Sequence, residues 1–109
     1  MQCNLESVQA AFAKMTANGW DTSAPLKWGF FFVHSSKEPL LKVFAEMKDY
    51  GYRTEGIHQA DDGVWVLQVS KTEVLAADKL HRRNVSFNDL AAHCGVDSYD
   101  GWDVGKPEP

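Results

Sequence analysis

The chain has 109 residues and a mass of 12.2 kDa, the size of one ordinary domain, so we expect a single domain over residues 1–109. Its formal net charge is −4, with 11 Lys and Arg against 15 Asp and Glu. An acidic surface argues against direct nucleic-acid binding, which needs cations to displace counterions, and against docking on an anionic membrane. The composition therefore points to a globular protein with other partners.

The N-terminal segment predicts a helix over residues 5–18, because apolar residues recur there at intervals of three and four. Asn4 is a suitable cap for its start, and Gly19 offers a left-handed stop. The first residues carry neither a basic region nor a long apolar run, so no signal peptide is expected. The predicted apolar face consists of Leu5, Val8, Phe12 and Met15.

Three strands are predicted in the middle of the chain. Residues 27–34, KWGFFFVH, are apolar on both alternating faces, which is typical of a central strand with both faces covered. Gly29 within this strand indicates a bulge or a close packing contact. Residues 64–70 repeat the doubly apolar pattern, whereas residues 52–58 are interrupted by Gly56 and are typical of an edge strand.

A second helix is predicted between the first two strands, opening at SSKEP and ending at Gly51. Pro39 fits its first turn, and Ser35, Ser36 or Glu38 is the expected cap. Its apolar stripe consists of Leu40, Val43, Phe44 and Met47.

A third helix is predicted over residues 76–94 and ends at Gly95. Asn84 interrupts its apolar face, and SFND at 86–89 could form a capping box that splits the segment into two helices. One helix is the favoured interpretation, because apolar residues stay in phase across Asn84. These residues are Leu80, Phe87, Leu90, Ala91 and Cys94.

The segment after Gly95, VDSYDGWDV, alternates enough to be a fourth strand, which completes the order α-β-α-β-β-α-β. Its last six elements match the ferredoxin-like βαββαβ plan. We therefore predict an α+β fold with a four-stranded antiparallel sheet, helices on one sheet face and an additional N-terminal helix. The core is expected to span about residues 5–103, with a short tail at 104–109.

The segment 98–103, SYDGWD, is both the predicted closing edge strand and a candidate protein-binding surface. Strict alternation places Tyr99 and Gly101 on one face and Asp100 and Trp102 on the other, and Gly101 permits a kink or a close approach. Tyr99, Asp100 and Trp102 are therefore the first candidate contact residues. A weaker second candidate is the acidic pair Asp61 and Asp62, in the hairpin turn predicted at residues 59–63.

No catalytic, metal or cofactor site is predicted. His58 with Asp61 or Asp62 lacks the further fixed ligands that a zinc site needs. His93 and Cys94 are adjacent on a helix, so their side chains point in different directions. Cys3 and Cys94 form no CxxC motif, and free thiols are expected. His34 is interpreted as an ordinary polar residue at the end of a strand, and His81 and His93 are twelve residues apart, which does not match the HExxH spacing.

Four segments carry a resemblance to a known family. They are NGWD at 18–21, YGYRTEG at 50–56, DDGVWVLQVSK at 61–71 and HCGVDSYDGWD at 93–103. In this order and spacing they resemble the ribonuclease E inhibitor family, regulator of ribonuclease activity B (RraB), over roughly residues 5–103; YDGW is the most specific part. The resemblance implies a cytoplasmic bacterial α+β domain that binds ribonuclease E as a protein ligand and restrains it, without chemistry of its own.

The sequence departs from the family's namesake after Trp102. The namesake has a strongly acidic tail there, whereas this chain continues with DVGKPEP, in which the acids are Asp103 and Glu108. If such a tail recruits a basic segment of the ribonuclease, this chain lacks that means of recruitment. The fold implied by the resemblance therefore transfers more directly than the inhibitory function.

Two other functions share the βαββαβ plan. An RNA-recognition module would stack bases on the aromatic residues of the central strands, but its supporting cations are reduced to Lys27 there, and the N-terminal helix is available to cover that face. The basic run 79–84 is more typical of a solvated helix face. A small-molecule-sensing domain would form a symmetric dimer. The sequence does not identify the oligomeric state.

Overall fold

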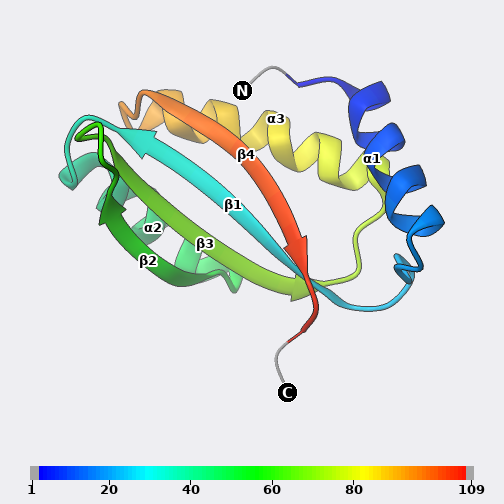
Figure 1. Ribbon diagram of the computed structural model, residues 1–109. Helices are drawn as coiled ribbons and strands as arrows, with labels where there is room; N and C mark the ends of the chain where they lie inside the picture. The colour runs from blue at the N-terminus through cyan, green and yellow to red at the C-terminus, as the bar shows by residue number, and fades with distance from the viewer. Residues whose placement is uncertain (1–2, 108–109) are drawn as a thin grey trace.

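The computed structural model describes residues 3–107 (Figure 1). In chain order its elements are α1 (Leu5–Ala17), β1 (Leu26–His34), α2 (Glu38–Met47), the short 3₁₀ helix η1 (Lys48–Tyr50), β2 (Arg53–Gln59), β3 (Trp65–Glu73), α3 (Ala77–His93) and β4 (Ser98–Gly105). This order confirms the predicted α+β fold. The last strand continues to Gly105, so the predicted tail begins two residues later than expected.

The four strands form one antiparallel sheet in the order β2-β3-β1-β4. The two doubly apolar strands, β1 and β3, are central, and the two weaker strands are edges, as predicted. This is the strand order of the ferredoxin-like split βαβ plan.

The helices lie on one face of the sheet, and the opposite face is open among residues 3–107 (Figure 1). This arrangement confirms the prediction that the helices lie on one sheet face, and on the open face the side chains of Phe31 and Val33 are only partly buried. The N-terminal helix does not cover the open face either. Instead α1 packs beside α3 and extends the helical layer, where Phe12 stacks on Trp28 with ring centroids 5.7 Å apart.

Aromatic rings from the sheet and α3 form the centre of the core. Trp28, Phe30 and Phe32 alternate along β1, point toward the helices and have no exposed surface. Phe87 of α3 packs against Phe30 and Phe32 in edge-to-face geometry, with ring centroids 4.9 and 5.6 Å apart. The intervening residue Phe31 lies on the open face and is partly exposed.

The ends of the helices test the predicted caps. The side chain of Asn4 accepts two backbone N–H groups at the start of α1, and Gly19 adopts φ 87° after its end, which confirms both predictions. The predicted cap of α2 was wrong, because Lys37 occupies that position without a side-chain cap. Pro39 at the second helical position has no N–H group for a capping side chain to bind.

Helix α3 is continuous from Ala77 to His93, which confirms the single-helix interpretation. Asn84 lies in the middle of its buried face and is 1% exposed. The hydroxyl of Tyr99 on β4 donates a 2.6 Å hydrogen bond to Asn84 Oδ1. The polar residue that interrupts the apolar face is therefore used to join α3 to the last strand.

Strand β4 contains one more residue than the segment of β1 that it pairs with. Phe31 lies opposite Gly101, whereas Phe32 lies opposite Tyr99, so Asp100 has no partner across the ladder. This is a β-bulge, and it changes which residues share a face of the strand.

The bulge brings Tyr99 and Trp102 to the same face, toward the helices. Tyr99 packs on Phe32 with ring centroids 5.2 Å apart, and Trp102 packs on Trp28 at 5.8 Å. The prediction that Trp102 shares a face with Asp100, opposite Tyr99, was therefore wrong. Strict alternation does not hold across an inserted residue.

The bulge depends on Gly101, whose φ of 133° is a conformation that residues with side chains rarely adopt. We expect Gly101→Ala to lower the free energy of unfolding by about 1–3 kcal/mol, measured by urea denaturation. Gly105→Ala is the matched control in the same strand, because a Cβ there meets no atom within 4 Å. Equal losses at the two sites would contradict a special backbone requirement at Gly101.

Candidate functional site

Tyr99, the first predicted contact residue, is fully buried. Its ring lies among Phe32 and Phe87, at centroid distances of 5.2 and 5.5 Å. Burial raises the pKa of Tyr99, so its hydroxyl stays protonated and donates to Asn84. The side chain stabilises the core and presents no surface to a partner in this conformation.

Asp100 and Trp102 differ from Tyr99 in exposure. Asp100 is exposed at the bulge, and its carboxylate has no hydrogen bond or ion pair with any residue in the described range 3–107. Trp102 is partly buried against Trp28 and partly exposed. Among the predicted contact residues of segment 98–103, Asp100 is therefore the one whose side chain is fully accessible to a partner.

The acidic pair of the hairpin is exposed at the turn between β2 and β3. The turn is closed by a 2.8 Å hydrogen bond from Ala60 N–H to the Val64 carbonyl, and Asp62 Oδ1 accepts the N–H of Val64 at 3.0 Å. Asp61 has no hydrogen bond or ion pair within residues 3–107. Asp62 thus helps to shape the turn, and Asp61 is free to bind.

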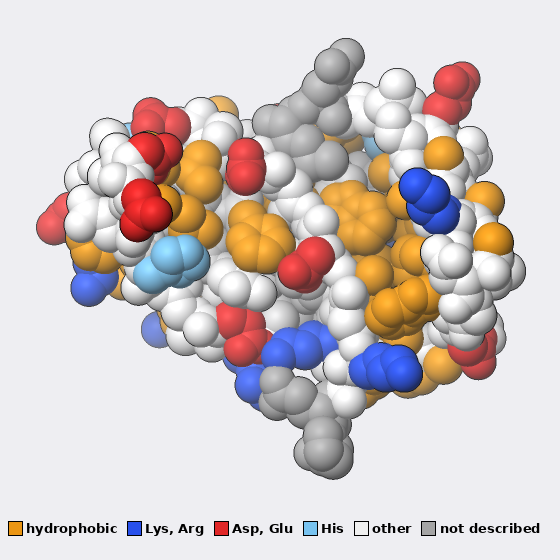
Figure 2. All heavy atoms as spheres, in the orientation of Figure 1, with side chains coloured by type: hydrophobic (Ala, Val, Ile, Leu, Met, Phe, Trp, Pro, Cys, Tyr) orange, Lys and Arg blue, Asp and Glu red, His pale blue; other side chains and the backbone are white. Residues whose placement is uncertain are grey.

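The register of the sheet places the hairpin and the start of β4 at the same end. At that end of β1, His34 lies opposite Trp65 of β3, and Val33 lies opposite Ser98 of β4. Figure 2 shows the open face, with acidic side chains gathered at the end that carries the hairpin. We call this region, defined by Asp61, Asp62 and Asp100, the acidic end of the sheet.

Glu55 neutralises much of the positive charge on the open face. Its Oε1 accepts hydrogen bonds from Ser70 Oγ at 2.6 Å and Lys27 Nζ at 2.7 Å, and Arg53 Nε lies 3.4 Å away. The hydrogen bonds from Lys27 and Ser70 hold the pKa of Glu55 below its ordinary value.

Gly29 on the same open face marks a close packing contact, as the sequence indicated. A Cβ at this position would overlap the Asp103 carboxylate.

The open face lacks the stacking platform of an RNA-recognition module. Among the aromatic residues of β1 and β3, only Phe31 faces the open side, because Trp65 packs with the core. The basic run on α3 is also paired: Arg83 donates to the Glu73 carboxylate through Nη1 and Nη2, and Arg82 lies 3.6 Å from Asp78. Arg82 therefore matches the expected solvated helix face, whereas Arg83 is mostly buried and paired with Glu73.

No group of three or more His, Cys, Asp or Glu side chains in the described part of the chain is arranged to hold a metal ion. His34 Nδ1 accepts the N–H of Asp97 at 3.0 Å, a contact that joins the end of β1 to the start of β4. Cys3 and Cys94 are free, and burial raises the pKa of Cys94, which disfavours the reactive thiolate. None of the described helices is long and apolar enough to cross a bilayer.

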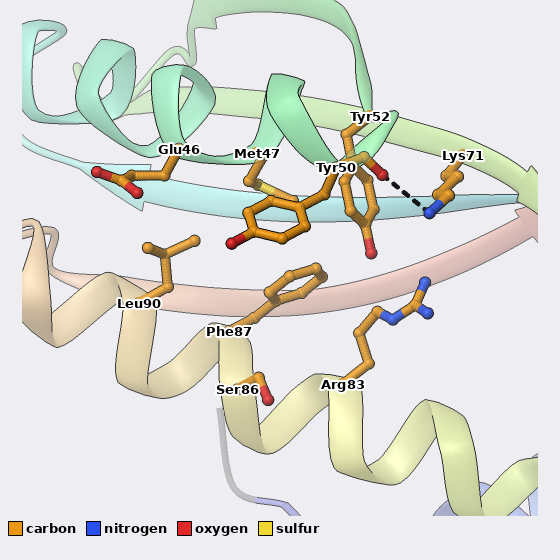
Figure 3. A pocket seen from close by; sticks show the side chains of 9 residues that line it. All are labelled: Glu46, Met47, Tyr50, Tyr52, Lys71, Arg83, Ser86, Phe87 and Leu90. Atoms are coloured by element: carbon orange, nitrogen blue, oxygen red, sulfur yellow. Dashed lines mark hydrogen bonds between the residues drawn. The ribbon is translucent and has the colours of Figure 1, made fainter.

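A pocket of about 560 Å³ lies on the helical side, between α2 with η1 and α3 (Figure 3). The sequence analysis missed it, because its residues come from separate elements and each fits an ordinary role in its own element. The signal in the sequence is the pair of tyrosines on either side of Gly51. In the structure Tyr52 is buried and Tyr50 is 72% exposed. The apolar lining of the pocket consists of Met47, Tyr50, Tyr52, Phe87 and Leu90.

Tyr99→Phe tests the buried hydrogen bond, because it leaves Asn84 Oδ1 without its donor. The Asn84 Nδ2 group already has no acceptor within the described residues. We expect the free energy of unfolding to fall by about 1–3 kcal/mol in urea denaturation. Tyr50→Phe is the control, because it removes an exposed hydroxyl and should leave the free energy of unfolding unchanged. A Tyr99→Phe variant as stable as wild type would contradict a stabilising role of this hydrogen bond.

Glu55→Gln tests the lowered pKa of Glu55. Because the folded pKa lies below the unfolded value of about 4.3, the charge stabilises the fold above that pH, and this contribution is lost as pH falls through the folded pKa. The urea midpoint of Glu55→Gln should therefore lie below that of wild type at neutral pH, and the gap should close in acid. A gap that stays constant over the whole pH range would contradict the ion-pair role.

A comparison with known protein families agrees with the resemblance that the sequence shows. A family model described as regulator of ribonuclease activity B matches residues 6–104, from the first turn of α1 to the residue before the last of β4. A comparison with curated proteins finds no match. Because the family match covers nearly the whole chain, the chain belongs to the regulator of ribonuclease activity B family.

Proposed function

We propose that this protein is a non-catalytic regulator that binds an endoribonuclease of the ribonuclease E type directly and restrains its activity in the bacterial cytoplasm. Family membership supports the regulatory role. The observation that carries the proposed mode of binding is the acidic end of the sheet, where the carboxylates of Asp61 and Asp100 have no partner within residues 3–107.

The proposed partner surface is a basic segment of the ribonuclease. Lys27 and Arg53 on the open face already contact Glu55, so unpaired negative charge remains at the acidic end. A net charge of −4 adds long-range attraction for a basic partner. Such attraction raises the association rate and weakens as salt screens it.

The predicted contact residues take different roles in this proposal. Asp61 and Asp100 offer free carboxylates, and Asp62 offers its second carboxylate oxygen beside the turn hydrogen bond. Trp102 contributes the partly exposed part of its ring. Tyr99 acts indirectly, because its buried contacts hold the strand on which Asp100 is displayed.

The test is calorimetric titration of the protein into ribonuclease E from the same organism, with RNA cleavage measured in parallel. We expect a dissociation constant of about 10 μM or below, and a lower cleavage rate at saturating protein. Asp61→Asn with Asp100→Asn should weaken binding about fivefold to tenfold at low salt and less at high salt, because the attraction is screened.

The matched control is Asp49→Asn with Asp89→Asn. It removes the same charge from exposed positions on the helical side, so it should leave the affinity within about twofold if position rather than net charge decides binding. Equal weakening by both double variants would assign the effect to net charge alone. Absence of binding by the wild-type protein at tens of micromolar would remove the proposed function and leave the fold unchanged.

A further inference from the structure

The helical-side pocket has the size and lining of a small-molecule site. Its volume of about 560 Å³ lies within the roughly 300–1,000 Å³ of such sites. Tyr52 and Phe87 form its aromatic floor, in edge-to-face contact at 5.7 Å, and Met47 and Leu90 add apolar walls. The pocket lies on the opposite side of the sheet from the open face of Figure 2.

Three donor groups converge at one end of the pocket: the ammonium of Lys71, the hydroxyl of Tyr52 and the guanidinium of Arg83 (Figure 3). Lys71 Nζ lies 5.2 Å from the centroid of the Tyr52 ring, and Arg83 Cζ lies 5.8 Å from it. Burial raises the pKa of Tyr52 to about 12, so its O–H remains a donor at neutral pH.

The positive charge at this end is only partly compensated. Arg83 is paired with Glu73, but within residues 3–107 Lys71 Nζ donates only to the backbone carbonyl of Tyr50, at 2.9 Å. No carboxylate among residues 3–107 pairs with Lys71. The ammonium of Lys71 therefore remains available to a ligand, because its three N–H donors are not all used.

The opposite end of the pocket limits the charge of that ligand. Glu46 lies there on α2, and its carboxylate would repel a second negative group (Figure 3). One unpaired ammonium at one end and one carboxylate at the other suit a single negative charge better than a phosphate, which carries about −1.5 to −2 at neutral pH.

From this arrangement we propose that the pocket binds a small monocarboxylate with an aromatic or aliphatic body. The ligand carboxylate lies at Lys71 and Tyr52, and the apolar body lies on Phe87 and Leu90. Tyr50, whose side chain is 72% exposed, covers part of the bound body. The site is separate from the acidic end, so this inference does not rest on ribonuclease binding.

The test uses the isolated protein with indole-3-acetate and octanoate as carboxylate probes, and indole-3-acetamide as the neutral match. At least one carboxylate should bind with a dissociation constant of about 1 mM or below and shift the NMR signals of Met47, Tyr50 and Leu90. The amide should bind at least about tenfold more weakly than the matching acid, because it lacks the charge.

Lys71→Gln should weaken carboxylate binding about tenfold and leave amide binding within about twofold. Lys14→Gln, on the distant helix α1, is the control and should change neither. Ser86→Trp fills the pocket from its exposed rim and should abolish binding of acid and amide alike. Retention of the wild-type NMR dispersion shows that each variant is folded.

Three results would overturn the proposal. The first is that neither carboxylate binds the folded wild-type protein at probe concentrations several times above about 1 mM. The second is equal affinity for the acid and the amide. The third is unchanged acid binding in a folded Lys71→Gln variant. A ribonuclease-binding defect has no effect on these readouts, because the ribonuclease is absent from the experiment.

Discussion

The structure depends on one inserted residue in its last strand. Asp100 has no partner across the ladder to β1, and this bulge turns Tyr99 and Trp102 toward the helices together. Without it, strict alternation would leave one of the two large rings on the open face and would leave the core short of an aromatic contact. Gly101, with φ 133°, supplies the backbone conformation that follows the bulge.

The same constraint separates structure from recognition within the YDGW segment. Tyr99 is buried in the core and Trp102 packs against the core with part of its ring exposed, while Asp100 points outward, beside the end of the sheet that carries Asp61 and Asp62. The helical side carries a different chemistry, with an unpaired ammonium above an aromatic floor. A basic protein segment and a small anion would therefore occupy opposite faces without competing for the same groups.

Periodicity predicted the elements and their order, because each helix buries one stripe and the central strands are apolar along their whole length. The βαββαβ plan predicted helices on one sheet face, but periodicity did not show which side of β1 they leave open, because Phe31 is as apolar as the inward-facing residues beside it. Periodicity placed Trp102 on the wrong side, because an inserted residue changes no hydrophobicity, and Gly101 was the only local sign. The pocket was also missed, because Lys71 and Arg83 meet around Tyr52 only after the sheet and helices have packed.

The central claim is that Tyr99 and Trp102 lie on the same, helical side of β4. Nuclear Overhauser effects in solution measure this directly. We expect contacts from the Trp102 indole to Trp28, together with contacts from the Tyr99 ring to Phe32. Contacts from the Trp102 indole to Phe31 on the open face, in place of those to Trp28, would show an unbulged strand and would contradict the account.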